Sequence, residues 1–287
     1  MSPSDALGWL ADAQADCDLA QSGLSLLRLL PKLGVFLERA RQVADIREVA
    51  PGDVRAWVDS PLPGGRRPSL ATRYTRRAAA RFGFRLLREA RLVDHDPTAD
   101  VPLPPRGRDR EARPLTDDEI HRGRAASVSV LGETRRSTVW ALAEATATVS
   151  ETTRVLATHI DIKKGTVALP GSSRVDPRTG RLSKWGVGVL EHRLSIVESG
   201  GDQAVGYDGA DRPAASTRTA VTADLARVLT AAGLRSDPAV KVGSVRAWAG
   251  HRVLAETGRV DEAARALGCR TLDTAAAIIG FDWRNPQ

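Results

Sequence analysis

The chain has 287 residues, of which 42% are hydrophobic and 27% charged, a balance that excludes a mainly disordered protein and fits two ordinary globular domains. Its two cysteines, Cys17 and Cys269, lie far apart and outside any CxxC or Cys/His spacing, which argues against a disulfide framework or a zinc site. The longest apolar run is interrupted by Arg28, Pro31 and Lys32, so we expect no membrane span. We expect no cofactor and a cytoplasmic location.

Positive charge is concentrated in one part of the chain. The formal net charge is +7 and the isoelectric point about 10.1. Residues 66–113 contain 13 Arg and 6 acidic residues, so this segment alone carries the whole excess. A basic segment attached to a neutral body is typical of proteins that bind a polyanion, most often nucleic acid. An acidic protein partner is the alternative.

The first hundred residues read as helical. Leucines at three- and four-residue spacing predict a helix over residues 4–43, with a kink or break at Pro31. A second helix is expected over residues 53–59, and Gly and Pro make residues 61–68 a loop. Ser69 can then cap a long helix that ends near Ala90.

That long helix is predicted to have an apolar face, with Ala79, Phe82, Leu86 and Ala90, and an opposite cationic face. The cationic face carries Arg73, Arg77, Arg81, Arg85 and Arg88. Because no acidic residue lies between residues 66 and 88, we expect these arginines to lack partners within the helix. A face directed at DNA is favoured over an ordinary solvated face.

A linker and a second domain follow. Residues 101–114 contain four prolines and four arginines without hydrophobic periodicity. Thr116 and Glu119 then form a capping box, so a new domain is expected to begin near Leu115. We predict a helix at 138–157, strands at 160–162, 166–169 and 181–187 with a turn at 176–180, and helical segments at 214–232, 245–257, 260–267 and 272–279.

The order of these pieces resembles the tyrosine recombinase (phage integrase, Xer-like) family. In the first half the resemblance rests on residues 54–57, the Arg-rich helix, residues 92–97 and the Pro/Arg linker with its exit at residues 113–119. It implies a mainly α (α+β) fold. A helical core-binding-like domain (1–100) and a linker (101–114) would precede an integrase-like domain with a small antiparallel sheet (115–287).

In the second half the same resemblance implies a degenerate active site. The family's first catalytic arginine falls on Thr148, the histidine of its second box on Gly243, the histidine of its third box on Cys269 and its nucleophilic tyrosine on Ile278. Transesterification of a phosphodiester needs a nucleophile and cationic groups that stabilise the transition state. We therefore expect no recombinase activity. Cys269 is interpreted as a small core residue, and Arg154 should point elsewhere on its helix.

Some cations remain candidates for contact with DNA. Arg246 survives from the second box, with Arg252 farther along its helix, while Arg174 or Lys184 could match the family's turn lysine. The full set of predicted DNA-contacting residues is Arg73, Arg76, Arg77, Arg81, Arg85, Arg106, Arg108, Arg174, Lys184, Arg246 and Arg252.

The sequence thus predicts a catalytically inactive protein that binds double-stranded DNA as a monomer or dimer and is therefore nucleoid-associated in the cytoplasm. Its role would be that of a regulator, an architectural factor or an accessory factor for a mobile element. Two other functions stay open: a recombinase with a nucleophile from an unexpected position or a partner chain, and a protein-interaction module with a relic integrase fold.

Overall fold

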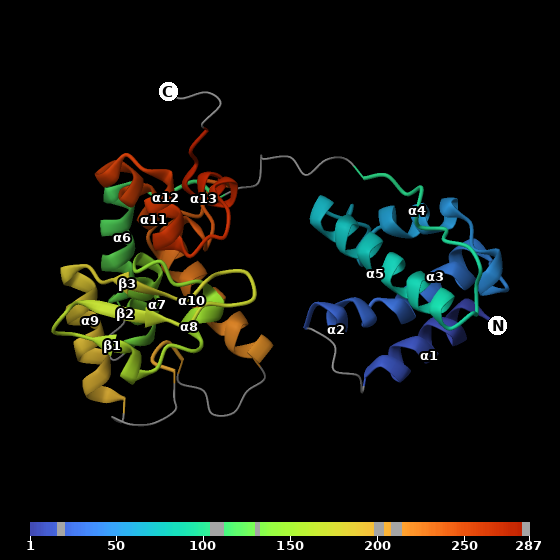
Figure 1. Ribbon diagram of the computed structural model, residues 1–287, viewed down its shortest axis with the longest axis horizontal. Helices are drawn as coiled ribbons and strands as arrows, with labels where there is room; N and C mark the ends of the chain where they lie inside the picture. The colour runs from blue at the N-terminus through green and yellow to red at the C-terminus, as the bar shows by residue number, and fades with distance from the viewer. Residues whose placement is uncertain (16–20, 104–111, 130–132, 198–203, 208–213, 283–287) are drawn as a thin grey trace. The chain divides into compact units, whose positions relative to one another are not determined.

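A computed structural model describes residues 1–15, 21–103, 112–129, 133–197, 204–207 and 214–282 (Figure 1). The chain divides into two compact units, residues 1–107 and 108–287. Within the described residues no helix is both long and apolar enough to cross a membrane.

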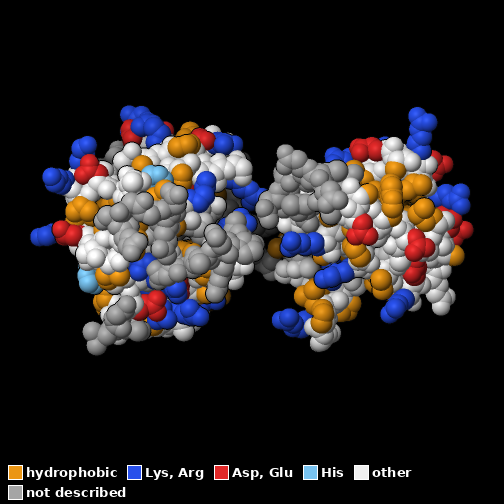
Figure 2. Space-filling view, turned by 90° about the horizontal axis from the view of Figure 1, so that it is seen from below, with side chains coloured by type: hydrophobic (Ala, Val, Ile, Leu, Met, Phe, Trp, Pro, Cys, Tyr) orange, Lys and Arg blue, Asp and Glu red, His pale blue; other side chains and the backbone are white. Residues whose placement is uncertain are grey.

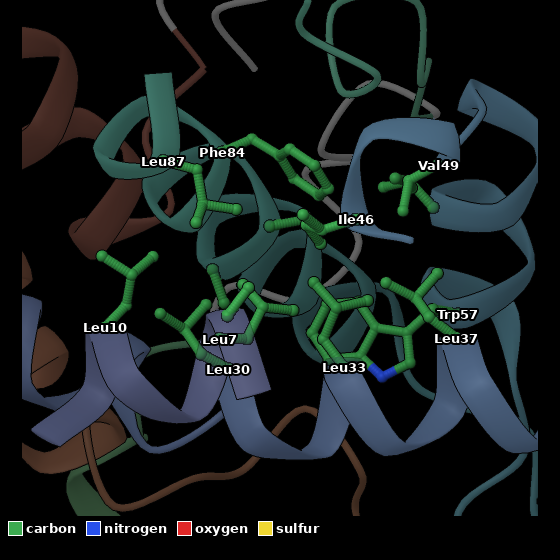
Figure 3. Close-up of a cluster of buried hydrophobic side chains, with 14 of the residues drawn as sticks. Leu7, Leu10, Leu30, Leu33, Leu37, Ile46, Val49, Trp57, Phe84 and Leu87 are labelled. Atoms are coloured by element: carbon green, nitrogen blue, oxygen red, sulfur yellow. The ribbon is translucent and has the colours of Figure 1, made fainter. Parts of the chain in front are cut away.

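The first unit consists of helices packed around one apolar core. Their bounds are α1 (Pro3–Ala15), α2 (Gln21–Leu27), α3 (Leu30–Arg41), the 3-10 turn η1 (Ile46–Glu48), α4 (Pro51–Asp59) and α5 (Leu70–Glu89). Figure 3 shows how Leu7, Leu33, Trp57 and Phe84 meet in this core from α1, α3, α4 and α5. The hydrophobic effect of burying these large side chains holds the helices together.

The expected helix over residues 4–43 is three helices instead. Helix α2 ends at Leu27 and α3 begins at Leu30, so the break comes just before Pro31. Proline is tolerated in the first turn of a helix, where its missing N–H has no partner to lose. Leu30, Leu33 and Leu37 are fully buried, which confirms the predicted leucine stripe along α3.

Helix α5 begins as predicted, but its buried face differs from the prediction. The Ser69 hydroxyl accepts a hydrogen bond from the Thr72 N–H at 3.2 Å. The buried positions are Ala79, Ala80, Gly83, Phe84 and Leu87, whereas Phe82 and Leu86 are only partly buried and Ala90 is exposed. The packed face is therefore rotated from the predicted one.

The second unit surrounds one buried helix with further helices and a small sheet (Figure 1). Its elements are α6 (Asp117–Ser127), α7 (Arg135–Glu144), α8 (Val149–Thr152), η2 (Ala157–His159), β1 (Ile160–Asp161), β2 (Thr166–Leu169), β3 (Arg178–Arg181), α9 (Lys184–Ile196), α10 (Ala214–Ala231), α11 (Ser244–Thr257), α12 (Val260–Leu267) and α13 (Leu272–Ile279). The sheet has the antiparallel order β1-β2-β3, with Val167 paired to Ile160 and Gly180.

The predicted helix at 138–157 is wrong in both bounds. Helix α7 ends at Glu144, Thr146 has a φ of 73°, and only the short α8 follows. Every residue from Ser137 to Glu144 is buried, so α7 shows no apolar stripe from which its length could be read. Close packing is visible at Gly123, where a Cβ would lie 2.1 Å from the Trp140 ring.

The predicted third strand is also displaced. Strand β3 covers Arg178–Arg181, and the segment expected to be a strand at 181–187 instead starts α9, whose N-terminus is capped by Ser183. The turn lies at Ser172–Val175 rather than at 176–180, since Ser172 and Val175 form an isolated bridge.

Other predictions for this unit are confirmed. Thr116 and Glu119 form the predicted capping box at α6, and α10 to α13 lie within a residue of their expected bounds. The fold is mainly α with a small antiparallel sheet, as expected. The predicted linker is anchored at both ends, because Val101 is buried in the first core and Arg113 pairs with Glu119 and Asp237 at 2.7 Å each.

Candidate nucleic-acid interface

The arginines of α5 fall into two groups. Arg81, Arg85 and Arg88 are exposed, whereas Arg73 and Arg77 are partly buried. Acidic residues from outside residues 66–88 pair with several of them: Asp59 with Arg73 at 2.6 Å, Glu89 with Arg85 at 3.7 Å, and Asp96 with Arg88 at 3.6 Å. The expectation that these arginines lack partners within the helix is wrong for Arg85, because Glu89 lies four residues farther along α5, just beyond the acid-free segment 66–88. The partners of Arg73 and Arg88 come from outside the helix.

Arg76 is used inside the first unit. Its Nη1 donates to the carbonyls of Trp57 and Ser60, at 3.0 and 2.5 Å, and to the Ser60 hydroxyl at 3.0 Å. Burial lowers the pKa of Arg76, and the nearby charge of Asp59 only partly opposes this shift. The side chain caps the end of α4. The prediction that Arg76 contacts DNA is not favoured by this geometry.

The outward cations form no continuous single-sign patch on the face drawn in Figure 2, where blue side chains alternate with acidic and apolar ones. In the first unit the exposed arginines of α5 lie at residues 81, 85 and 88, spaced to follow one side of the helix. Arg77 lies on the same side, and its buried Nε has no hydrogen-bond partner among the described residues.

In the second unit, the position assigned to the first catalytic arginine begins α8. The Thr148 hydroxyl accepts from the Glu151 N–H at 3.2 Å, and the Glu151 carboxylate accepts from the Thr148 N–H at 2.8 Å. Thr148 therefore serves as a helix cap and supplies no positive charge.

A cation does reach this region, but from β3. Arg178 donates to the Glu151 carboxylate at 2.7 Å and to the carbonyl of Ala266 at 2.9 Å, and its side chain is only 6% exposed. Burial would raise the pKa of Glu151, but hydrogen bonds from Arg178 and Thr148 outweigh that effect and hold it below its ordinary value. The sequence offered little signal for this pair, since 27 residues separate its members.

Arg246, at the start of α11, lies beside the Arg178–Glu151 pair. Its Nε donates to the Thr146 carbonyl at 3.0 Å and its Nη2 to the carbonyl of Leu267. Burial lowers the pKa of Arg246, and the neighbouring Arg178 adds to that shift, while Cys269 and Glu151 oppose it. The guanidinium thus ties α11 to the turn after α7 and to the end of α12. A contact with a DNA phosphate stays a prediction.

A cavity of about 470 Å³ adjoins Arg246. It is lined by Ala112, Gly243, Arg246, Ala247, Asp273, Thr274, Ala277 and Ile278. Gly243 and Ile278 occupy the positions that the resemblance gives to the second-box histidine and the tyrosine. Their side chains carry neither an imidazole nor a hydroxyl, so these walls are apolar.

The remaining predicted residues are dispersed. Arg174 and Lys184 are exposed, at the turn before β3 and at the start of α9. Arg252 lies 5.0 Å above the Trp248 ring and 3.1 Å from Glu256. Arg106 and Arg108 lie outside the described residues.

Two further expectations concern residues near the positions that the resemblance assigns to catalysis. Arg154 lies in the turn after α8 rather than on a helix, and it donates to the Ser150 and Gly171 carbonyls. Cys269 is partly buried and packs on the α12–α13 core. No group of His, Cys, Asp and Glu in the described part of the chain could hold a metal ion.

Comparison with solved structures identifies the fold. Residues 75–356 of lambda integrase, as a dimer bound to a COC′ core site, match with a TM-score of 0.70 at 15% identity, covering 100% of this chain and 98% of that one. The chain has the tyrosine-recombinase fold. The Tn1549 transposon integrase with circular intermediate DNA matches with a TM-score of 0.63 at 11% identity, covering 97% and 95% of the two chains.

A third match is the XerH site-specific recombinase bound to difH substrate in a pre-cleavage complex. It has a TM-score of 0.67 at 14% identity and covers 98% of this chain and 82% of that one. No protein-family model matches the sequence, and no curated protein does. The likeness to the tyrosine recombinases is therefore one of fold.

Proposed function

We propose that this protein binds duplex DNA without cutting it. The observation that carries the proposal is the match of nearly the whole chain to integrases in complex with DNA. The exposed arginines of α5 supply cations suited to phosphate contacts in the first unit. Arg174, Lys184 and Arg252 are the proposed contacts of the second unit, since all three are exposed.

The proposed absence of strand cleavage follows from the chemistry of the second unit. Attack on a phosphodiester needs a nucleophile, and Ile278 has none at the assigned position. Arg178, which pairs with the Glu151 of the Thr148 capping box, already holds that buried carboxylate and a main-chain carbonyl. Loss of a single preorganised donor typically costs about 2.7–4 kcal/mol of transition-state stabilisation, and here the nucleophile is missing too.

We propose a role as regulator, architectural factor or accessory factor. A protein that holds DNA but leaves it intact can bend it, occupy a site or recruit an active recombinase. A selection of bound sequences from a random duplex library would distinguish a site-specific regulator, which enriches one motif, from an architectural protein, which enriches none.

The test is binding and covalent trapping on the same duplexes. We expect the affinity for DNA to fall steeply with salt, and we expect nicked suicide substrates to leave no protein–DNA adduct. A covalent adduct would establish instead an active recombinase with an unconventional nucleophile. Salt-independent or undetectable binding to duplexes would favour the protein-interaction module.

A further inference from the structure

We infer that the cavity beside Arg246 is a binding site for a small molecule with one carboxylate on a compact apolar body. The inference does not depend on DNA binding. It rests on the size of the cavity, its lining and the electrostatic surroundings of Arg246.

The size of the cavity suits a small organic molecule. Its volume of about 470 Å³ falls within the range of roughly 300–1,000 Å³ typical of ligand pockets. A lone phosphate group or a water cluster would leave most of its apolar wall unfilled. The space exists because Gly243 has no side chain and alanines stand at positions 247 and 277.

The lining requires a ligand that is mostly apolar. Ala247, Ala277 and Ile278 offer no hydrogen-bonding side-chain atoms, and Gly243 and Ala112 add none. Contact with these walls would remove apolar ligand surface from water, which is the main driving force for binding in such pockets.

Arg246 supplies the one positive charge in the lining. The nearest buried acid, Glu151, is already paired with Arg178, so these two charges offset each other. No carboxylate of the described residues forms an ion pair with Arg246, which bonds to two main-chain carbonyls and to the side chain of Cys269. A largely buried charge without a counter-ion is costly, and a ligand carboxylate would supply that counter-ion.

The hydrogen-bonding pattern leaves room for that carboxylate. Nε and Nη2 of Arg246 are engaged by Thr146 and Leu267, and the Cys269 side chain also bonds to this guanidinium, whereas Nη1 donates to no oxygen of the described residues. A carboxylate there would receive a charge-assisted hydrogen bond. Asp273, exposed in the lining, adds a negative charge that disfavours ligands with several anionic groups.

Isothermal titration of the purified full chain, without DNA, tests the inference with named probes. Butanoate, octanoate and phenylacetate are compared with the neutral amides of the same acids and with inorganic phosphate. We expect at least one carboxylate to bind one to one, at least about tenfold more tightly than its amide and than phosphate.

Variants locate the site. Arg246→Gln should weaken carboxylate binding by at least about tenfold. Ala277→Phe should abolish carboxylate binding, because the phenyl ring would fill the cavity while the Arg246 guanidinium stays in place. This second variant tests the site even if Arg246→Gln fails to fold. Arg235→Gln is the matched control, because Arg235 is exposed and lies outside the cavity lining.

Three results would overturn the inference: no carboxylate of the panel binds, amides or phosphate bind as tightly as the acids, or folded Ala277→Phe retains full affinity. Because every measurement is made without DNA, none of these results bears on the proposed DNA binding.

Discussion

The arginines of α5 and those of the second unit's central cluster share a chemistry but differ in their surroundings. Arg81 and Arg85 extend from a helix face into solvent. Arg178 and Arg246 are withdrawn from solvent and hold together segments that are distant in sequence, through Glu151 and the carbonyls of Thr146, Ala266 and Leu267. The number of charges along the chain does not distinguish an arginine exposed to solvent from one that is buried and bonded within the fold.

The difference shows that arginines of one chain can serve either solvent or the interior of the fold. An exposed guanidinium contributes little to stability because water and salt screen it, so it is available to an external phosphate. A buried guanidinium is costly unless it is fully bonded, and once bonded it becomes part of the structure. The two regions should therefore respond to mutation in opposite ways.

The largest expected effect is on the buried pair. Arg178→Leu should lower the free energy of unfolding by about 3–5 kcal/mol, because Glu151 would stay buried without its counter-charge. Chemical denaturation measures this. Arg174→Gln, an exposed change in the same hairpin, should stay within about 0.5 kcal/mol of the parent. If Arg178→Leu lowers the free energy of unfolding by less than about 1 kcal/mol, the Arg178–Glu151 pair does not stabilise the fold as we expect.

Arg76 should behave like the buried group although it lies on α5. Arg76→Met removes charge-assisted hydrogen bonds to the end of α4 and should cost about 1.5–3 kcal/mol of stability. Its affinity for duplex DNA, measured on the folded variant, should match that of the parent. If Arg76→Met is as stable as the parent but binds DNA more weakly, Arg76 contacts DNA rather than stabilising the end of α4.

The exposed pair should show the reverse pattern. Replacing Arg81 and Arg85 by Gln should leave the melting temperature unchanged, while the slope of log K against log salt becomes shallower by up to about two units. Arg28 and Arg55, exposed on the connection before α3 and on α4, provide a matched double substitution that should change the slope less. Equal slopes for both double variants would make the α5 face an ordinary solvated surface.

The smallest expected effect is a pH dependence of stability. Folding lowers the pKa of Glu151 below its ordinary value of 4.5, so the stability it contributes is present above that value and is lost as the pH falls through the folded pKa. The difference in unfolding free energy between the parent and Glu151→Gln should shrink on acidification below pH 4.5. A difference that stays constant down to acid unfolding would contradict the depressed pKa.

Local chemistry in the sequence determined several features directly. The Ser69 cap, the capping box of Thr116 and Glu119, and the helices α10 to α13 were predictable because caps and apolar spacing act within a few residues. That the side chain of Ile278 carries no hydroxyl is likewise a matter of residue identity at the position assigned by resemblance.

Tertiary structure decided the features that depend on contacts between distant segments. Helix α7 is buried on all sides, so no hydrophobic periodicity in the sequence marks its end at Glu144. Helix α9 begins at Lys184, within the segment 181–187 for which the sequence predicts a strand. The partners of Arg73, Arg76, Arg178 and Arg246 come from other segments. An arginine's identity is local, but whether its charge serves solvent, a carbonyl or a carboxylate depends on what folding brings within about 3 Å of it.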